Sequence, residues 1–371
     1  MSFCRKLFNV HLEYMKRVGY LGDRQLAFCL LSLPIFCCFA TFYRIYTIWN
    51  NFEEVVANLF KVSGLVTITI RSFLVLSKQE RFLNFFDDIE NWYLDLQIEN
   101  NEMTMQKLHG FTRKTRRASI LLFSIMIICI FCLSSIQMMT SSSKLLVEVQ
   151  FPGIDLYASP YYEIISVLQA LWLAPIVLLT YVSYLCVLMI SISFGIFLMK
   201  DLQQKLESMS EMNELEALKC IKKCIQRHVL ILKYHKDLEA LFSVGNFVDV
   251  SIFCIIPCVI IVYSNMDYNL AFMITDIQLV FIVTISTYFI FWLANCFCIE
   301  GINIAHAAYN CNWIDRNKDF RKHILLIMVI GQKPLELTAG GLKPMNMNSF
   351  LAIVRFAYSF FTILKGTKKD N

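Results

Sequence analysis

Long apolar stretches separated by polar loops dominate the hydrophobic pattern of this chain. Seven of them are long enough to cross a bilayer, because a spanning helix needs roughly 17–25 predominantly apolar residues. They cover residues 25–48, 55–76, 118–140, 163–192, 246–264, 271–299 and 346–364. The fourth and sixth run long, so we expect them to tilt or to extend beyond the bilayer. The pattern predicts an all-α integral membrane protein with seven transmembrane helices.

Two of the loops between these stretches have a helical periodicity of their own. Their apolar positions are Phe82, Phe85, Phe86, Ile89, Trp92, Tyr93 and Leu96 in the loop 77–117, and Leu218, Ile221, Ile225, Val229, Leu232, Leu238 and Leu241 in the loop 199–245. Such helices can lie on a membrane surface, or they can pack on each other and on residues 302–331. We favour packing, and we expect the helix over 213–243 to continue into the fifth span.

Composition supports a membrane protein, and the distribution of charge predicts its orientation. Hydrophobic residues make up 57% of the 371 positions, whereas a soluble domain has about 45–50%. Of the 34 Lys and Arg residues, 26 fall in segments 1–24, 77–117, 199–245 and 300–345, and only four fall in the alternate loops and the tail. Because basic loops stay in the cytoplasm, we predict a cytoplasmic N terminus and an extracellular C terminus.

The same reasoning divides the chain into four parts. Residues 1–24 form a cytoplasmic N-terminal segment, and 25–299 hold transmembrane helices one to six with long cytoplasmic helical extensions at 77–117 and 199–245. Residues 300–345 form a cytoplasmic assembly segment. Residues 346–371 form the seventh helix and a short extracellular tail.

Few residues point to chemistry. The chain has no Gly-rich phosphate loop and no nucleophile elbow, and its loop histidines lack carboxylates at metal-ligand spacing. All fourteen cysteines fall in spans or on the basic side, so no outer disulfide framework is available. We therefore predict no enzyme, no catalytic residue, no metal, no cofactor and no nucleic-acid partner.

Charged residues within spans suggest function by default. Arg71 and Asp249 lie near the inner ends of their spans, so placement at the membrane interface accounts for them. Arg355 lies well inside the last helix, on a stripe formed by Asn348, Ala352, Arg355, Ser359 and Thr362. The stripe is either a close-packed helix–helix face or a face exposed to water on a conduction path. The helix alone favours the packing face.

The turn before this helix has its own signals. Gly340 and Gly341 permit a tight turn, and Asn346 or Asn348 is a suitable N-cap. The segment from Leu337 to Pro344 is thus expected to act as a hinge by which the chain leaves the cytoplasmic bundle.

The chain resembles a known family, most strongly over its last 65 or so residues. "KPLELTAGGLKPMNMNSFLAIVRFAYSFFTILK" (333–365) is similar to the C-terminal signature of insect odorant receptors. "AAYNCNWIDRNKDFRKHILLIM" (307–328) is similar to the segment that precedes it, and "VQFPGIDLYASPYYEII" (149–165) to the second outer loop of that family. The related gustatory receptors usually end with a Gln-Phe pair, which this chain lacks. The odorant branch is therefore the closer resemblance.

This resemblance implies a tetrameric, ligand-gated, non-selective cation channel, in which a variable subunit binds the odorant and a shared co-receptor completes the channel. The subunit would lie in the plasma membrane of an olfactory sensory neuron dendrite, in contact with lipid. The motif places the narrow point of the pore at Ile363, with Thr362 beside it and Arg355 and Ser359 on the aqueous face. It shifts the interpretation of the stripe from packing face to pore.

The resemblance also places an odorant pocket in the outer half of the membrane, among spans two, three, four and six. A small volatile ligand suits a mostly apolar lining with a few polar groups. The residues at that depth are Asn58, Val62, Leu65, Ser134, Gln137, Met138, Gln169, Trp172, Ile176, Ile274, Gln278 and Phe281. Three other functions stay open: a gustatory-type receptor, a metabotropic seven-helix receptor, which needs the opposite orientation, and a transporter.

Overall fold

The computed structural model is almost entirely helical. It describes residues 2–98, 102–139, 145, 147–153, 155–263 and 270–367. The side chains that lie outside that description are those at 2, 9, 52–53, 126, 129–130, 133–134, 136–139, 178, 255–276, 279, 357 and 360–367. The long helices are α2 (Arg24–Thr47), α3 (Phe52–Ser77), α5 (Glu102–Met139), α7 (Ala174–Glu207), α8 (Glu214–Tyr263), α9 (Leu270–Asn310) and α11 (Met347–Thr367). The shorter elements are α1 (Ser2–Arg17), α4 (Gln79–Ile98), α6 (Tyr161–Leu168), η1 (Gln169–Leu173), η2 (Ser208–Glu211), α10 (Lys318–Gly331), β1 (Thr338–Ala339) and β2 (Lys343–Pro344).

Over the described residues, all seven predicted spanning segments are helical to within one residue at each end. The fourth predicted segment is assembled from α6, η1 and the first part of α7, and the fifth is the last part of α8. Within the described residues, four helices are long and apolar enough to cross a membrane by length and composition: Arg24–Thr47, Glu54–Ser77, Tyr161–Glu211 and Val280–Asn310. A shorter apolar helix covers Met347–Phe356. The all-α membrane fold predicted from the sequence is confirmed.

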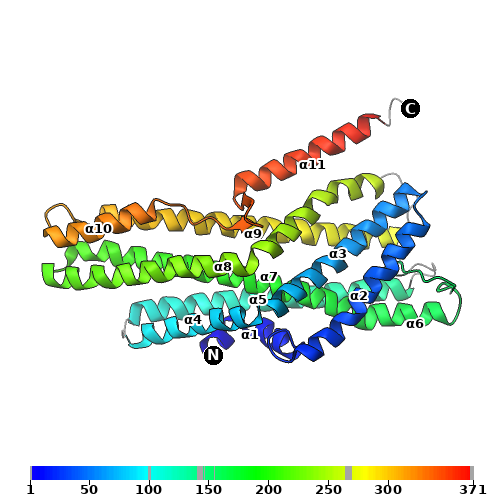
Figure 1. Ribbon diagram of the computed structural model, residues 1–371, viewed down its shortest axis with the longest axis horizontal. Helices are drawn as coiled ribbons and strands as arrows, with labels where there is room; N and C mark the ends of the chain where they lie inside the picture. The colour runs from blue at the N-terminus through cyan, green and yellow to red at the C-terminus, as the bar shows by residue number, and fades with distance from the viewer. Residues whose placement is uncertain are drawn as a thin grey trace.

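The long axis of the molecule divides it into two regions. Helices α7, α8 and α9 run along this axis, and α4 and α10 pack beside them at one end, while α2, α3 and α6 gather at the other (Figure 1). The region around α4, α10 and the adjoining parts of α7, α8 and α9 is called the helical bundle below. The predicted continuation of residues 213–243 into the fifth span is confirmed, since α8 runs unbroken for 50 residues.

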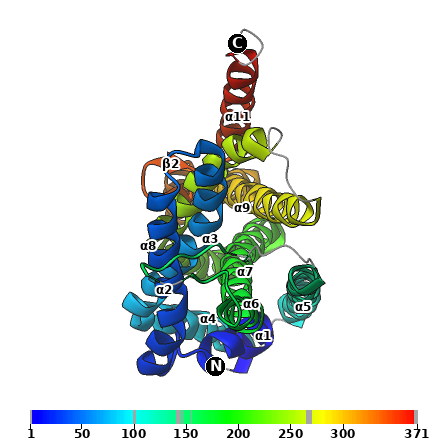
Figure 2. The ribbon, with the colours of Figure 1, turned by 90° about the vertical axis from the view of Figure 1, so that its right-hand side faces the viewer.

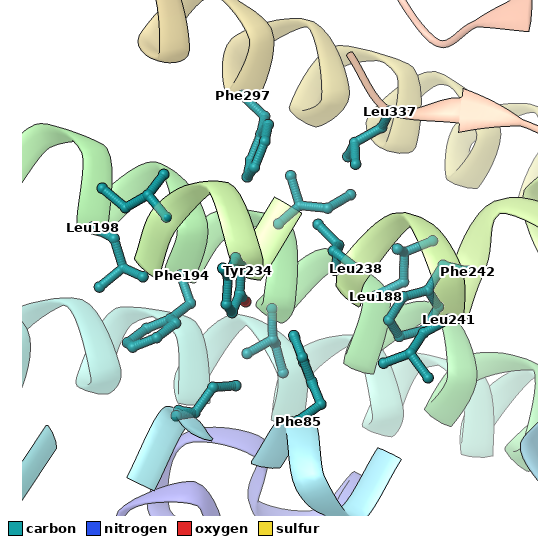
Figure 3. Packing of buried hydrophobic residues seen from close by; sticks show 14 of the residues in the cluster. Phe85, Leu188, Phe194, Leu198, Tyr234, Leu238, Leu241, Phe242, Phe297 and Leu337 are labelled. Atoms are coloured by element: carbon teal, nitrogen blue, oxygen red, sulfur yellow. The ribbon is translucent and has the colours of Figure 1, made fainter. Parts of the chain in front are cut away.

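Aromatic and aliphatic side chains from four helices fill the core of the helical bundle. Figure 3 shows Phe85 of α4, Phe194 of α7, Tyr234 of α8 and Phe297 of α9 converging, with Leu337 closing one side. The Phe85 and Tyr234 rings lie 5.0 Å apart, and the Tyr234 hydroxyl donates to the Ser191 carbonyl at 2.7 Å. The predicted packing of 77–117, 199–245 and 302–331 on each other is therefore present within one chain.

One detail of the predicted apolar stripes is wrong. Val229 was placed on the buried face of α8, but it is 57% exposed. The buried face instead passes through Cys224, His228 and Ile231. Two successive steps of four lead from Ile221 to Val229, and eight residues at 3.6 per turn rotate about 80° beyond two full turns, whereas the seven residues to His228 stop about 20° short of them.

A small β-hairpin attaches the last helix to α8. Thr338 pairs with Pro344 and Ala339 with Lys343, and Gly340 and Gly341 have φ of 66° and 72°, a conformation that glycine adopts without strain. The Gly340 amide donates to the Ser243 carbonyl at 2.9 Å, and the Thr338 amide donates to the Glu239 carboxylate at 3.0 Å. The predicted hinge is thus held on α8 by hydrogen bonds rather than standing free.

Candidate functional site

Helix α11 stands apart from the other helices. It projects away from them in Figure 1 and in the end view of Figure 2, and its main contacts are those of its first turns with α8 and α9. Asn346 caps it, accepting a hydrogen bond from the Ser349 amide at 2.8 Å. Phe350 inserts among three rings, those of Phe253, Tyr288 and Phe291, with centroids 5.6–5.7 Å away.

Two different faces of α11 have different environments. Ser349, Phe350 and Ile353 are buried against α8 and α9. The predicted stripe lies on another face, where Asn348, Ala352, Arg355 and Ser359 are all exposed. The face that buries α11 against α8 and α9 is therefore not the face of the stripe, whose described residues are exposed.

Large apolar residues also remain exposed on α11. Leu351, Val354, Phe356 and Tyr358 are all exposed, and Phe356 reaches 64%. A row of this size on a single helix marks a surface that lipid or another chain covers. The side chains of Thr362 and Ile363, assigned to the narrow point of the pore, lie outside the described residues.

The predicted ligand residues on α3 share one apolar cluster with the loop after α5. Val62 and Leu65 are buried in this cluster together with Leu145, Val147 and Leu173. Asn58 is also buried, and its Nδ2 donates to the Glu54 carbonyl at 2.9 Å. Its Oδ1 is buried without a hydrogen-bond partner among the described residues. Asn58 thus presents an acceptor inside an apolar environment.

Gln169 has a structural task in this fold. Its Oε1 accepts from the Val147 amide at 3.1 Å and its Nε2 donates to the Val147 carbonyl at 2.8 Å, so it ties the loop to η1. The element η1 is one turn of π-helix, and Pro175 lies just after it. Proline cannot donate to the preceding turn, and π-turns of this kind are frequent at functional sites.

The remaining predicted ligand residues are scattered or lie beyond the description. Trp172 and Phe281 are exposed, and Ile176 and Gln278 are half-buried. The side chains of Ser134, Gln137, Met138 and Ile274 lie outside the described residues. Among the predicted ligand residues, the structure therefore brings Val62 and Leu65 together in one apolar cluster. Val147 belongs to the same cluster and is hydrogen-bonded to Gln169.

Placement near the inner ends of their spans does not by itself account for Arg71 and Asp249. Arg71 is 1% exposed, and its Nη2 donates to Asp249 Oδ1 in a buried ion pair between α3 and α8. The guanidinium lies over the rings of Tyr181 and Tyr184 of α7, 4.6 and 4.7 Å from their centroids. The signal in the sequence was two opposite charges at similar depth in different spans.

Comparisons with known proteins agree on one family. A family model described as 7tm Odorant receptor matches residues 51–358. Odorant receptor 10 of Aedes albopictus is 27% identical over 322 residues, 85% of each chain, and Odorant receptor 30a of Drosophila melanogaster is 24% identical over 97% of this chain and 96% of that one. The solved structure of the olfactory receptor OR5 from Machilis hrabei, in complex with eugenol, superposes with a TM-score of 0.78 at 15% identity over 97% of this chain and 99% of that chain.

Proposed function

The chain belongs to the seven-transmembrane odorant receptor family, and on that premise we propose that it binds a small volatile molecule within the membrane and, with a co-receptor subunit, forms a ligand-gated cation channel. It is a multi-pass membrane protein and an odorant receptor by family. The channel, the co-receptor, the plasma membrane of a sensory dendrite and the cytoplasmic N terminus are parts of the proposal.

The surface of α11 is the observation that carries the channel proposal. An arginine in hydrocarbon is costly unless it reaches water or a partner, yet Arg355 is exposed on a helix that also exposes Leu351 and Phe356. A ring of subunits satisfies both requirements: the apolar residues contact neighbouring subunits and lipid, and the stripe with Arg355 lines a wet pore. Ile363 then forms an apolar constriction that gates by dewetting.

The α3 cluster supports an odorant pocket. Val62 and Leu65 supply apolar contact, and the Asn58 Oδ1 supplies one buried acceptor. A buried polar atom without a partner is costly, and a ligand hydroxyl that donates to Asn58 removes that cost. Small volatile alcohols and phenols are the ligand class that fits these groups.

The first test is functional expression. The chain is co-expressed with an insect co-receptor, and cation current is measured during application of a panel of volatile alcohols, esters and phenols that includes eugenol. We expect at least one compound to evoke a current that the co-receptor alone does not give. The absence of any response across a broad panel, with the chain present at the cell surface, contradicts the proposal.

The pore assignment has a matched pair of variants. Ile363→Ala is expected to change ion permeation or to raise the resting current, because a wider and less apolar ring dewets less readily. Leu351→Ala, an exposed position earlier on the same helix, is the control. Permeation and resting current equal to wild type in Ile363→Ala remove Ile363 from the gate.

The pocket assignment uses neighbouring positions in the same way. Trp172→Ala is expected to shift the odorant concentration for half-maximal current more than it changes surface expression. Leu171→Ala, next to it and also exposed, is the control. Unchanged sensitivity across the panel discards Trp172 as a ligand residue.

Two measurements separate this proposal from a metabotropic receptor. An epitope before Met1 is expected to be labelled only after permeabilisation, as the distribution of basic residues predicts. Odorant-evoked current is expected to persist in excised patches without nucleotides. Labelling on intact cells, or loss of current without nucleotides, favours the metabotropic alternative.

A further inference from the structure

A buried charge pair connects three helices on the membrane side of the fold. Arg71 of α3 and Asp249 of α8 form the pair, and the rings of Tyr181 and Tyr184 of α7 both contact the guanidinium. Gly245 of α8 makes room for this arrangement, because a Cβ there would overlap the Tyr184 hydroxyl. These residues, Arg71, Asp249, Tyr181, Tyr184 and Gly245, are called the charge lock below.

The charge lock is only partly satisfied. Arg71 Nε and Nη1 and Asp249 Oδ2 are buried without hydrogen-bond partners among the described residues. A cavity of about 10 Å³, close to the space for one water, lies beside the guanidinium and is also lined by Ser72, Thr180 and Ser183. An ion pair with unpaired atoms in a low-dielectric site gives less stability than a complete one, and it responds strongly to small displacements.

Helix α8 carries the contacts of the charge lock and those of α11 within a few turns. Ser243 binds the hairpin through Gly340, Asp249 binds Arg71, and Phe253 stacks on Phe350 of α11 at 5.7 Å. From Ser243 to Phe253 the helix advances only about 15 Å. A shift of this segment relative to α3 therefore moves the N-terminal end of α11.

Helix α3 carries the proposed pocket at its other end. Val62 lies nine positions before Arg71, about 13 Å along the same helix. One rigid helix thus joins the pocket to the charge lock, and a second rigid helix joins the charge lock to α11.

We propose that Arg71 and Asp249 are positioning residues for gating: their ion pair couples α3 to α8, and through α8 it sets the position of the pore helix α11. This inference rests on the proposed channel function. Coupling of this kind requires a contact whose free energy both sites change, and a buried, partly satisfied ion pair between the two helices is such a contact.

A charge-swap cycle tests the coupling. The variants Arg71→Asp, Asp249→Arg and the double swap are each co-expressed with the co-receptor, and Lys61→Ala on the same helix is the control for loss of a positive charge from α3. Current is recorded without odorant and across a concentration series of the compound that best activates the wild type. All currents are divided by the amount of receptor at the cell surface.

Each single variant is expected to change spontaneous current or the half-maximal concentration by roughly fivefold or more, the lower end of typical coupling between sites. The double swap is expected to return both quantities toward wild type. A purely structural pair lowers surface expression but leaves the normalised current and sensitivity unchanged, and that result overturns the inference. Failure of the double swap to restore gating, when it reaches the surface as wild type does, also overturns it.

The wild-type recordings distinguish failure of the proposed channel function from failure of this inference. A wild-type chain that adds no current to that of the co-receptor, with or without odorant, overturns the proposed function and this inference together. A wild-type chain that gates normally beside single variants that gate identically overturns the inference alone.

Discussion

The helical bundle and helix α11 both carry large apolar side chains, but the bundle buries them and α11 leaves several of them exposed. Phe297 of α9 is fully buried between α7 and α8, whereas Phe356 of α11 is 64% exposed. In the bundle, one chain supplies both sides of each apolar contact. On α11 only the face with Phe350 and Ile353 is covered in this way, and Leu351, Val354, Phe356 and Tyr358 stay exposed. The bundle therefore buries its large apolar residues within one subunit, whereas α11 leaves several of its own for lipid or other subunits to cover.

The largest effect is expected from truncating one phenylalanine in each region. Phe297→Ala is expected to destabilise the protein by about 3–5 kcal/mol, because it leaves a cavity in a packed core. Phe356→Ala is expected to change the stability of the isolated subunit by less than about 0.5 kcal/mol. Thermal unfolding of the detergent-solubilised subunit measures both.

The same two variants also test assembly. Phe356→Ala is expected to reduce the yield of oligomer with the co-receptor in native electrophoresis, while a subunit that tolerates Phe297→Ala assembles as wild type does. Equal destabilisation of the isolated subunit by both variants would show that α11 packs on its own chain far more than this fold allows.

Two arginines inside the predicted spans, Arg71 and Arg355, differ in the same way as the two regions. Arg71 is neutralised within the chain by Asp249, and Arg355 is exposed on α11. Depth along a span could not separate them, because a charge at any depth is stable if another element brings a partner to it. The partner of Arg71 lies 178 positions away in the sequence, and only the packing of α3 on α8 brings it close.

Features that depend on neighbouring residues could be predicted from the sequence, whereas features that depend on contacts between distant segments could not. Seven helices and the amphipathic loops were predictable, because apolar length and a period of 3.6 are local signals. Asn346 was predictable as a cap for the same reason. The use of Gln169 to hold Val147 and the π-turn of η1 were not, because both depend on a loop folding back onto a helix. Val229 is on the wrong face because two successive steps of four from Ile221 rotate about 80° away from the buried face of α8, which passes through His228 instead.

A buried histidine at the contact between α1 and α5 provides a smaller test. His11 of α1 packs edge-on against Phe123 of α5 at 5.5 Å, and burial lowers its pKa from 6.5 to about 4. Below pH 6.5 the unfolded chain therefore binds a proton that the folded chain does not. Stability is expected to fall as the pH drops from about 6.5 toward 4, by about 2 kcal/mol at pH 5.

Thermal unfolding between pH 7.5 and pH 5 measures this dependence. His11→Leu is expected to flatten the slope, and His306→Leu, at an exposed histidine on α9, is expected to keep it. Helix α11 contains no histidine, and burial also lowers the pKa of His228 on α8, so only the part of the acid sensitivity that His11→Leu removes belongs to the α1–α5 contact. An unchanged slope in His11→Leu would assign the acid sensitivity to other groups.

The smallest effect is expected where the two regions meet. Asn346→Ala removes the acceptor for the Ser349 amide and is expected to weaken the first turn of α11 by about 1 kcal/mol. Amide hydrogen exchange over 347–353 is then expected to quicken roughly fivefold, with the bundle unaffected. Asn348→Ala, two positions on and exposed, is the matched control. Equal exchange in the two variants would mean that packing of Phe350, rather than the cap, fixes the start of the helix.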